Sequence, residues 1–206
     1  MTLFQKILFK IASFLFPSKI YNFENIPVGK AILVSNHFSF VDPIFFLKLS
    51  KKEKIYVLAK KELFEKKIIS KLLKSFNAIP IDRDNPGINS VIQVTKALKN
   101  GNKVGIFPEG TRNKSKSNLP LDFKGGSVIF ALKAKCPIVP IMMLKKARLF
   151  RRTKIIVGKP IYFDDYYDKK LNVDEINTLG TLVRNKMIEI QNELNKLLNG
   201  KNYENL

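Results

Sequence analysis

The sequence contains one histidine, His37, and one cysteine, Cys136, among its 206 residues. A single cysteine excludes an internal disulfide and a cysteine cage for a metal ion. Cys136 lies in the apolar run AKCPIVP, where we expect a buried, inert thiol. One histidine near one aspartate also provides too few ligands for a metal site. The sequence therefore gives no indication of a metal centre or a disulfide framework.

Acidic residues are scarce, since 17 Asp and Glu stand against 37 Lys and Arg, which gives a formal net charge of +20. Such a charge attracts nucleic acid, anionic membranes, acidic carrier proteins or phosphorylated substrates. A general lysine bias with solvated charged faces produces the same excess, so charge alone does not select a partner. The acid-free segment 145–154, KKARLFRRTK, contains Phe150 and suits lipid headgroups, an acidic carrier protein or RNA.

No apolar run is long enough to cross a membrane. The first residues, MTLFQKILFKIASFLFP, carry apolar side chains at helical spacing but are interrupted by Lys6 and Lys10, and a span needs roughly 20 apolar residues. They also lack the small-residue cleavage site of a signal peptide. Residues 1–20 are therefore predicted to form a basic amphipathic helix that lies in a membrane interface or packs on the protein's own core. The many phenylalanines favour membrane contact.

The chain has no internal repeat, low-complexity segment or convincing linker, and its length suits one domain. Apolar runs that predict strands alternate with amphipathic patterns that predict helices, which is typical of an α/β fold. We predict a single domain of this class over residues 21–206: a mixed, mostly parallel sheet flanked by helices. Strands are expected at 31–36, 54–60, 78–83, 137–144 and 154–161, and segment 103–112 is expected to be a strand that enters a Pro-Glu-Gly turn. Helices are expected at 42–50, 62–76, 125–135 and 174–198, and segment 85–101 is expected to be a turn followed by a helix.

His37 occurs in VSNHFSFVDP, five positions before Asp42. On one continuous helix these two side chains would diverge. They can meet if His37 lies in the loop after a strand and Asp42 begins the next helix, with Asn36 and Ser39 fixing the turn. Asp42 would then accept a proton from one ring nitrogen and leave the other as a base. The alternative is a hydrogen-bonded loop histidine and an aspartate that only caps a helix.

A second cluster of candidate residues is FPEGTR, residues 107–112, after an apolar strand. Pro108 and Gly110 predict a sharp turn where the backbone can approach a ligand closely. Glu109 adds an acceptor and Arg112 a planar donor suited to phosphate. The alternative is a tight turn closed by an internal Glu109–Arg112 ion pair.

Further basic residues stand at predicted strand ends. Arg83 follows AIPID, and Lys60 and Lys61 lie at a strand-to-helix junction. Each is a candidate phosphate ligand, although a solvated surface charge is the more common role for such residues.

The order of these blocks resembles the glycerolipid acyltransferase family. NHFSFVD is similar to the family's NHx4D block, AKKELF and NAIPIDR to its second block, FPEGTR to its third and VPI (139–141) to its fourth. The segment 119–141 also resembles the one that follows the third block. The resemblance covers residues 25–165, and within the family it is greatest to bacterial members that acylate lysophosphatidate. Phe38 and Phe40 make the first block unusually aromatic, and Asn113 follows Arg112 where serine is frequent.

The resemblance implies transfer of a fatty acyl group from an acyl carrier protein or coenzyme A thioester to the sn-2 hydroxyl of lysophosphatidate. His37 would be the general base and Asp42 its orienting partner, without a metal or redox cofactor. The residues implied in binding the acceptor's glycerol phosphate are Lys60, Arg83, Glu109, Gly110, Thr111 and Arg112. The residues implied in supporting the motifs are Asn36, Ser39, Pro108 and Pro140.

Two alternatives remain from the sequence. One is acylation of another acceptor, such as glycerol 3-phosphate or a different lysophospholipid. The other is an inactive basic membrane- or RNA-binding module, which would leave the NHx4D and EGTR blocks unexplained. The expected location is the cytoplasmic face of the cell membrane, as a peripheral or monotopic protein in contact with anionic lipid. An acidic acyl carrier protein is a candidate partner, and no nucleic acid is expected.

Overall fold

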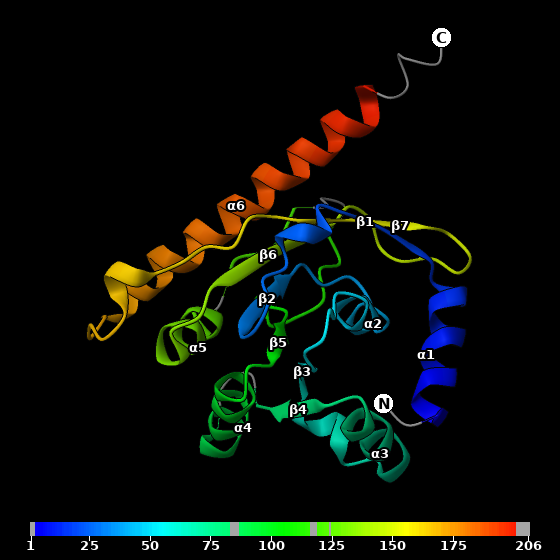
Figure 1. Ribbon diagram of the computed structural model, residues 1–206, viewed down its shortest axis with the longest axis horizontal. Helices are drawn as coiled ribbons and strands as arrows, with labels where there is room; N and C mark the ends of the chain where they lie inside the picture. The colour runs from blue at the N-terminus through cyan, green and yellow to red at the C-terminus, as the bar shows by residue number, and fades with distance from the viewer. Residues whose placement is uncertain (1–2, 83–86, 116–118, 124, 201–206) are drawn as a thin grey trace.

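The computed structural model describes residues 3–82, 87–115, 119–123 and 125–200, and it shows an α/β domain around one seven-stranded sheet (Figure 1). The strands are β1 (Ser18–Tyr21), β2 (Ala31–Ser35), β3 (Ile55–Lys60), β4 (Ala78–Ile81), β5 (Lys103–Ile106), β6 (Ile138–Met143) and β7 (Thr153–Val157). Their order across the sheet is β1-β7-β6-β2-β5-β3-β4. Strands β2 to β6 run parallel, and β7 is antiparallel to β6. The predicted fold class is therefore confirmed.

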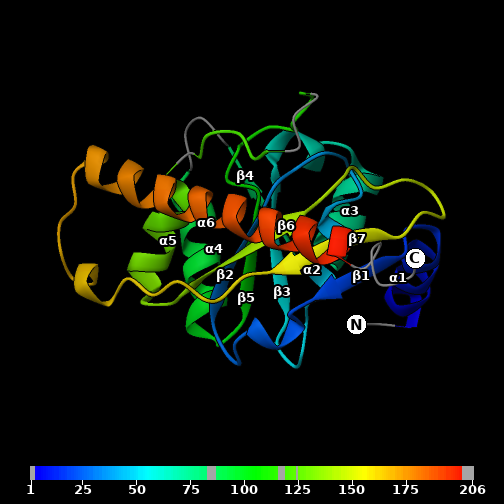
Figure 2. The same ribbon diagram turned by 90° about the horizontal axis from the view of Figure 1, so that it is seen from above.

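Helices cover both faces of the sheet. They are α1 (Leu3–Leu15), α2 (Pro43–Leu47), α3 (Lys67–Ser75), α4 (Ile88–Lys99), α5 (Gly126–Ala134) and α6 (Val173–Gly200). Helices α4, α5 and α6 lie on one side of the sheet and α1, α2 and α3 on the other, with α6 running across β6 and β7 (Figure 2). Among the described residues, none of these helices has both the length and the apolar character that a bilayer span requires.

The central strands are buried on both faces, which explains their nearly continuous apolar sequence. All five residues of β2, AILVS, are buried. Because side chains alternate along a strand, Ile32 and Val34 join the cluster beneath α4, α5 and α6, whereas Leu33 joins the cluster beneath α2. Phe45 and Phe46 of α2 fill that second cluster. The sheet thus divides the core into two apolar layers.

The structure corrects three of the predicted elements. Strand β1 was not predicted, because its sequence SKIY has no clear period, and it forms through parallel pairing with β7. The helix predicted over 62–76 is wrong in its first part: residues 61–64 form a 3-10 turn, Lys66 is extended and α3 begins at Lys67. The strand predicted over 154–161 ends at Val157, although Ile161 still makes an isolated bridge to Ile138.

Helix α1 packs against the domain with one side only. Its inner residues Leu8, Phe9 and Ala12 line an apolar cavity shared with α2 and α3. The side chain of Gln5 donates to the carbonyl of Ser75 at the end of α3. Lys48 Nζ donates to the carbonyl of Phe16, 2.9 Å away. The helix ends at Leu15, so the rest of the predicted helical segment 1–20 includes the start of β1.

The opposite side of α1 carries an exposed apolar stripe, which we define as Phe4, Ile7, Ile11 and Phe14. Phe14 is 73% exposed and Phe4 64% exposed. One side of the helix therefore contacts the core, whereas the other leaves large apolar side chains uncovered, and membrane contact stays a prediction.

Candidate active site

The first and third blocks of predicted motif residues meet at one edge of the sheet. Because β2 to β6 are parallel, their carboxyl ends meet at the same edge, where α/β proteins commonly bind ligands. The loop after β2 carries His37, and the loop after β5 carries residues 107–113. The backbone N–H of Asn113 donates to the carbonyl of His37 at 2.6 Å, which joins the two loops directly.

His37 and Asp42 form a hydrogen-bonded pair. His37 Nδ1 lies 2.9 Å from Asp42 Oδ2, and both side chains are buried. The same Oδ2 accepts the backbone N–H groups of Phe38 at 2.6 Å and Ser39 at 2.7 Å. Ser39 Oγ donates to Oδ1 at 2.6 Å. Asp42 makes no side-chain capping bond to α2, so its carboxylate serves the histidine loop rather than the helix.

This arrangement defines which nitrogen of His37 can act as a base. Asp42 Oδ2 already accepts two backbone N–H groups and is therefore an acceptor toward His37 as well. Nδ1 then carries the proton, and Nε2 is the nitrogen that can take one. A buried carboxylate at this position also stabilises the imidazolium that forms after proton uptake.

Aromatic rings hold the imidazole from one side. The ring of Phe107 stacks on that of His37, with centroids 4.1 Å apart and planes 19° apart. Phe46 of α2 in turn contacts Phe107 at a centroid distance of 5.0 Å. Gly105 leaves room for Phe46, because a Cβ at this glycine would lie 2.7 Å from the ring. The imidazole of His37 therefore packs against Phe107, which in turn packs against Phe46.

Glu109 faces inward, toward the backbone of the histidine loop. Its Oε1 accepts the N–H of His37 at 3.0 Å, and the residue is 5% exposed. Burial raises the pKa of the Glu109 carboxyl from 4.5 to about 7, although the backbone amides of His37 and Leu121 favour the charged form. Asp42 adds to the increase and Arg184 opposes it. Glu109 therefore joins the first and third blocks through a carboxyl group that ionises near neutral pH.

The substitution Glu109→Gln tests whether folding raises the pKa of the Glu109 carboxyl. Folding raises the pKa of Glu109, so its contribution to stability is complete below about pH 4.5 and is lost as the pH rises through about 7. Gln keeps the acceptor for the His37 N–H but does not ionise. Between pH 5 and pH 8 we expect the wild-type free energy of unfolding to fall by on the order of 2–3 kcal/mol more than that of the variant. Urea denaturation at both pH values measures this, and equal pH dependence would contradict the assignment.

Asn36 and Asn113 fasten the site to neighbouring segments. The Asn36 side chain donates to the carbonyl of Met143 and accepts its N–H, both at 2.9 Å, which ties the loop to the end of β6. Asn113 Nδ2 donates to the carbonyl of Leu119 at 2.8 Å, and its Oδ1 accepts the N–H of Ser115 at 2.9 Å. These buried amides fix the loops on both sides of His37.

The rest of the third block is more exposed. Pro108 is buried, and Gly110 has φ of +65°, a conformation that glycine adopts without a side-chain penalty. Thr111 is exposed and Arg112 half-buried. Glu109 and Arg112, both described residues, form no ion pair with each other. Instead the Arg112 guanidinium carbon lies 3.8 Å from the ring centre of Phe40, a cation–π contact.

The remaining predicted site residues are Lys60, Arg83 and Pro140. Lys60 ends β3 at the same edge, where its Nζ pairs with Glu62 at 3.0 Å and is about half exposed. Arg83 lies outside the described residues. Pro140 is buried within β6, opposite Val34 of β2, and its strand positions Met143, the partner of Asn36.

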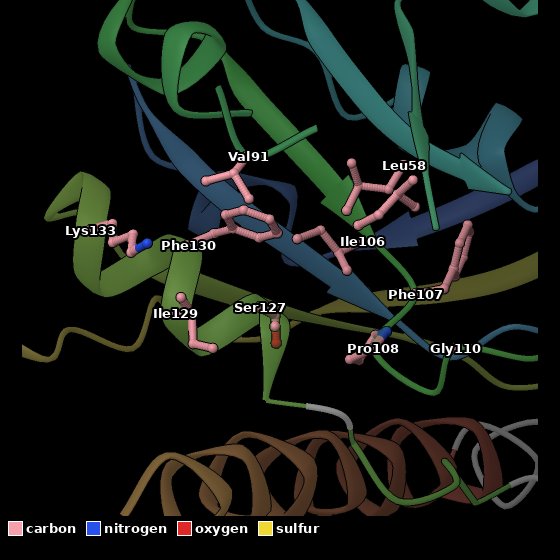
Figure 3. Close-up of a pocket in the computed structure, with 12 residues that line it drawn as sticks. Leu58, Val91, Ile106, Phe107, Pro108, Gly110, Ser127, Ile129, Phe130 and Lys133 are labelled. Atoms are coloured by element: carbon pink, nitrogen blue, oxygen red, sulfur yellow. The ribbon is translucent and has the colours of Figure 1, made fainter. Parts of the chain in front are cut away.

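An apolar cavity of about 220 Å³ opens beside the third block (Figure 3). Phe107, Pro108 and Gly110 form one part of its wall, and Ile106, Ile129 and Phe130 are among the other lining residues. The larger cavity beneath α1, about 330 Å³, lies across the sheet and includes Phe40 in its wall. Leu58 lines the first and Val57 the second, as the alternation of β3 requires.

No three His, Cys, Asp or Glu side chains of the described residues are grouped so that they could hold a metal ion. Cys136 is buried, as predicted, and burial raises the pKa of its thiol to about 11. The thiol therefore stays protonated and unreactive near neutral pH.

Sequence reasoning did not single out Phe107, Met143 or Arg184. Phe107 was visible as the residue before Pro108, but stacking on His37 depends on how two loops meet. Arg184 of α6 donates through Nε to the carbonyls of Pro120 and Leu121, both at 3.1 Å, and so holds the segment after the third block. No local pattern marks either contact.

The chain is similar to known acyltransferases in both sequence and fold. The family model described as "Acyltransferase" matches residues 18–144. The 1-acyl-sn-glycerol-3-phosphate acyltransferase of Bacillus subtilis is 33% identical over 87% of this chain and 90% of its own length. That of Streptococcus pneumoniae is 30% identical over 82% of this chain and 64% of its own length. The crystal structure of the 1-acyl-sn-glycerophosphate (LPA) acyltransferase PlsC of Thermotoga maritima has a TM-score of 0.63 at 22% identity, covering 91% of this chain and 81% of that one, which supports the fold.

Proposed function

This chain belongs to the acyltransferase family, and on that premise we propose that it acylates the sn-2 hydroxyl of 1-acylglycerol 3-phosphate, giving phosphatidate. The names of its relatives in Bacillus subtilis and Streptococcus pneumoniae support this acceptor. The observation that carries the proposal is the His37–Asp42 pair, 2.9 Å apart at the edge of the sheet that also bears the third block. The fatty acyl group comes from a coenzyme A or acyl carrier protein thioester.

The proposed reaction needs one base and no covalent enzyme intermediate. His37 Nε2 takes the proton of the acceptor hydroxyl while the hydroxyl oxygen attacks the thioester carbonyl. The tetrahedral intermediate collapses by breaking the carbon–sulfur bond, and the departing thiolate takes the proton back from the imidazolium. Asp42 stabilises the imidazolium between these steps. At the end His37 is neutral again, the acceptor carries an ester and the donor is a free thiol.

The acceptor phosphate is assigned to the exposed part of the third block. The Arg112 guanidinium is a planar, permanently charged donor, and Gly110 and Thr111 beside it allow close approach to the backbone. Lys60 contributes positive charge at the same edge, and Arg83 remains a predicted ligand. Glu109 has a different role in this proposal: it fixes the position of His37 through the backbone and does not contact the acceptor.

Two apolar cavities match the two hydrocarbon chains that the reaction brings together. The donor carries the acyl chain to be transferred, and the acceptor already carries one. The cavity beside Pro108 and the cavity beneath α1 lie on opposite faces of the sheet, and each reaches one of the motif loops. Burying a methylene group is worth about 0.8 kcal/mol, so such cavities supply much of the binding free energy of a lipid.

We further propose that the protein binds the membrane peripherally through α1. The exposed apolar stripe of α1 and its lysines, Lys6 and Lys10, suit an interfacial helix. The net charge of +20 favours anionic lipid on the cytoplasmic side, and it also suits an acidic carrier protein as donor.

An assay with labelled acyl thioester tests the acceptor and the donor together. Lysophosphatidate, other lysophospholipids and glycerol 3-phosphate are each offered with acyl-coenzyme A and with acyl carrier protein. We expect labelled phosphatidate from lysophosphatidate with at least one donor. Faster acylation of glycerol 3-phosphate or of a lysophospholipid without the phosphomonoester would reject the proposed acceptor, and no product with any acceptor would reject the activity.

A further inference from the structure

We propose that the loop between β6 and β7, residues 144–152, is a second membrane-binding element that forms one continuous surface with α1. The partner is the anionic face of a lipid bilayer. This second element rests on the proposed membrane binding through α1 and extends it, and it does not depend on which acceptor is acylated.

The loop is attached to the end of α1 (Figure 1). The N–H of Phe150 donates to the carbonyl of Leu15 at 2.7 Å, and the N–H of Thr153 donates to that of Pro17 at 2.8 Å. The last carbonyls of a helix have no partner within the helix, so the loop supplies one that the helix lacks. The rings of Phe14 and Phe150 also meet edge to face, with centroids 5.9 Å apart. The loop and the helix end therefore form one unit.

The tip of the loop, Leu149 and Phe150, presents two large apolar side chains to the solvent. Leu149 is 52% and Phe150 61% exposed, and Phe150 has φ of +54°. This left-handed conformation is unfavourable for a bulky residue, and such strain is common at functional positions. The turn that presents the tip is closed by the N–H of Arg151, which donates to the carbonyl of Arg148 at 3.1 Å. The tip extends the exposed apolar stripe of α1 beyond the helix.

The charged residues of the segment that carries this tip are all basic. Segment 145–154 contains no acidic residue, and its exposed basic side chains are Lys145, Lys146, Arg148, Arg151, Arg152 and Lys154. Lysine and arginine beside apolar side chains at a bilayer surface keep their charge among anionic headgroups while the apolar groups insert. An acidic carrier protein would match the charge but would leave the exposed Leu149, Phe150 and α1 stripe unexplained. The combination favours a lipid surface.

The loop also starts close to the candidate active site. It leaves β6 after Met143, whose backbone binds the side chain of Asn36 next to His37. Membrane contact through this loop therefore brings the edge of the sheet that carries His37 toward the lipid, where a lysophospholipid acceptor resides.

A single tryptophan reports on insertion, since the natural chain has none. In full-length Phe150→Trp we expect a blue shift of the emission when vesicles of phosphatidylcholine and phosphatidylglycerol are added, and quenching when the lipids carry bromine. Val28→Trp is the matched control, because Val28 is 82% exposed at the other end of β2. It should show neither effect. Emission from Phe150→Trp that does not respond to vesicles would overturn the proposal.

Vesicle sedimentation provides the second readout. We expect Leu149→Ser/Phe150→Ser to lower vesicle affinity about tenfold or more, and Arg148→Gln/Arg151→Gln/Arg152→Gln to lower it only when phosphatidylglycerol is present and salt is low. Controls that remove the same number of exposed apolar side chains or positive charges elsewhere are Val28→Ser/Val173→Ser and Lys169→Gln/Lys170→Gln/Lys196→Gln. If the loop variants bind vesicles like the wild type and instead lose only activity with acyl carrier protein as donor, the loop is a carrier-protein site and the proposal is wrong.

Discussion

Replacing His37 with alanine is expected to lower kcat for acyl transfer by about 10³-fold or more, because general-base catalysis and the stabilised imidazolium are lost together. The variant should still bind donor and acceptor, since His37 is not among the residues assigned to the phosphate or the hydrocarbon chains. KM should therefore change much less than kcat. Steady-state kinetics with saturating thioester and varied acceptor measure both quantities.

Two neighbouring variants separate catalysis from loop structure. Asp42→Asn keeps the size of the side chain but loses the charge that stabilises the imidazolium, and we expect a loss of kcat close to that of His37→Ala. Ser39→Ala removes only the 2.6 Å hydrogen bond to Asp42 Oδ1 and should cost much less activity. Unchanged circular dichroism and vesicle binding show that each variant is folded. Turnover of His37→Ala near the wild-type level would eliminate His37 as the base.

Most strands of the sheet could be predicted from the sequence, because buried parallel strands consist of short apolar runs. AILVS and IVPIMM are buried over their whole length in β2 and β6. Strand β1 had no such signal. Its four residues are only partly buried, and it exists because β7, far away in the chain, offers an edge to pair with.

The candidate site, like the sheet, could be predicted from the sequence only in part. The meeting of His37 and Asp42 follows from chain geometry, because a loop before a helix start brings residues five apart together. The orientation of Glu109 did not follow from its motif, since the carboxyl could have faced the solvent beside Arg112. It points inward because the N–H of His37, from a different loop, offers a partner there. The sequence identifies the residues, whereas tertiary contacts decide which of them face a substrate.

Replacing Arg112 with alanine is expected to raise KM for lysophosphatidate about 10- to 100-fold, the range that the loss of a charge-assisted hydrogen bond to phosphate implies. The change in kcat should be smaller, because the hydrogen bonds that hold the His37–Asp42 pair do not involve Arg112. Arg112→Lys should recover part of the loss, since lysine keeps the charge but not the planar pair of donors. Measurement of KM for lysophosphatidate and of inhibition by glycerol phosphate separates phosphate recognition from other effects. Wild-type KM in Arg112→Ala would remove Arg112 from the phosphate site.

Phe40 makes this prediction more specific, because its ring lies 3.8 Å from the Arg112 guanidinium carbon while most of the side chain stays exposed. An aromatic face limits where the guanidinium can turn, so Phe40 is a positioning residue for Arg112 and gives a reason for the aromatic first block. A cation–π contact is worth about 0.5–2 kcal/mol. Phe40→Leu should therefore raise KM for lysophosphatidate roughly 2- to 30-fold, and Phe40→Trp should leave it near the wild-type value. In the Arg112→Ala background Phe40→Leu should have no further effect on KM. A full additional increase in that double variant would show that Phe40 acts on the acceptor without Arg112, for example through the cavity beneath α1 that it lines.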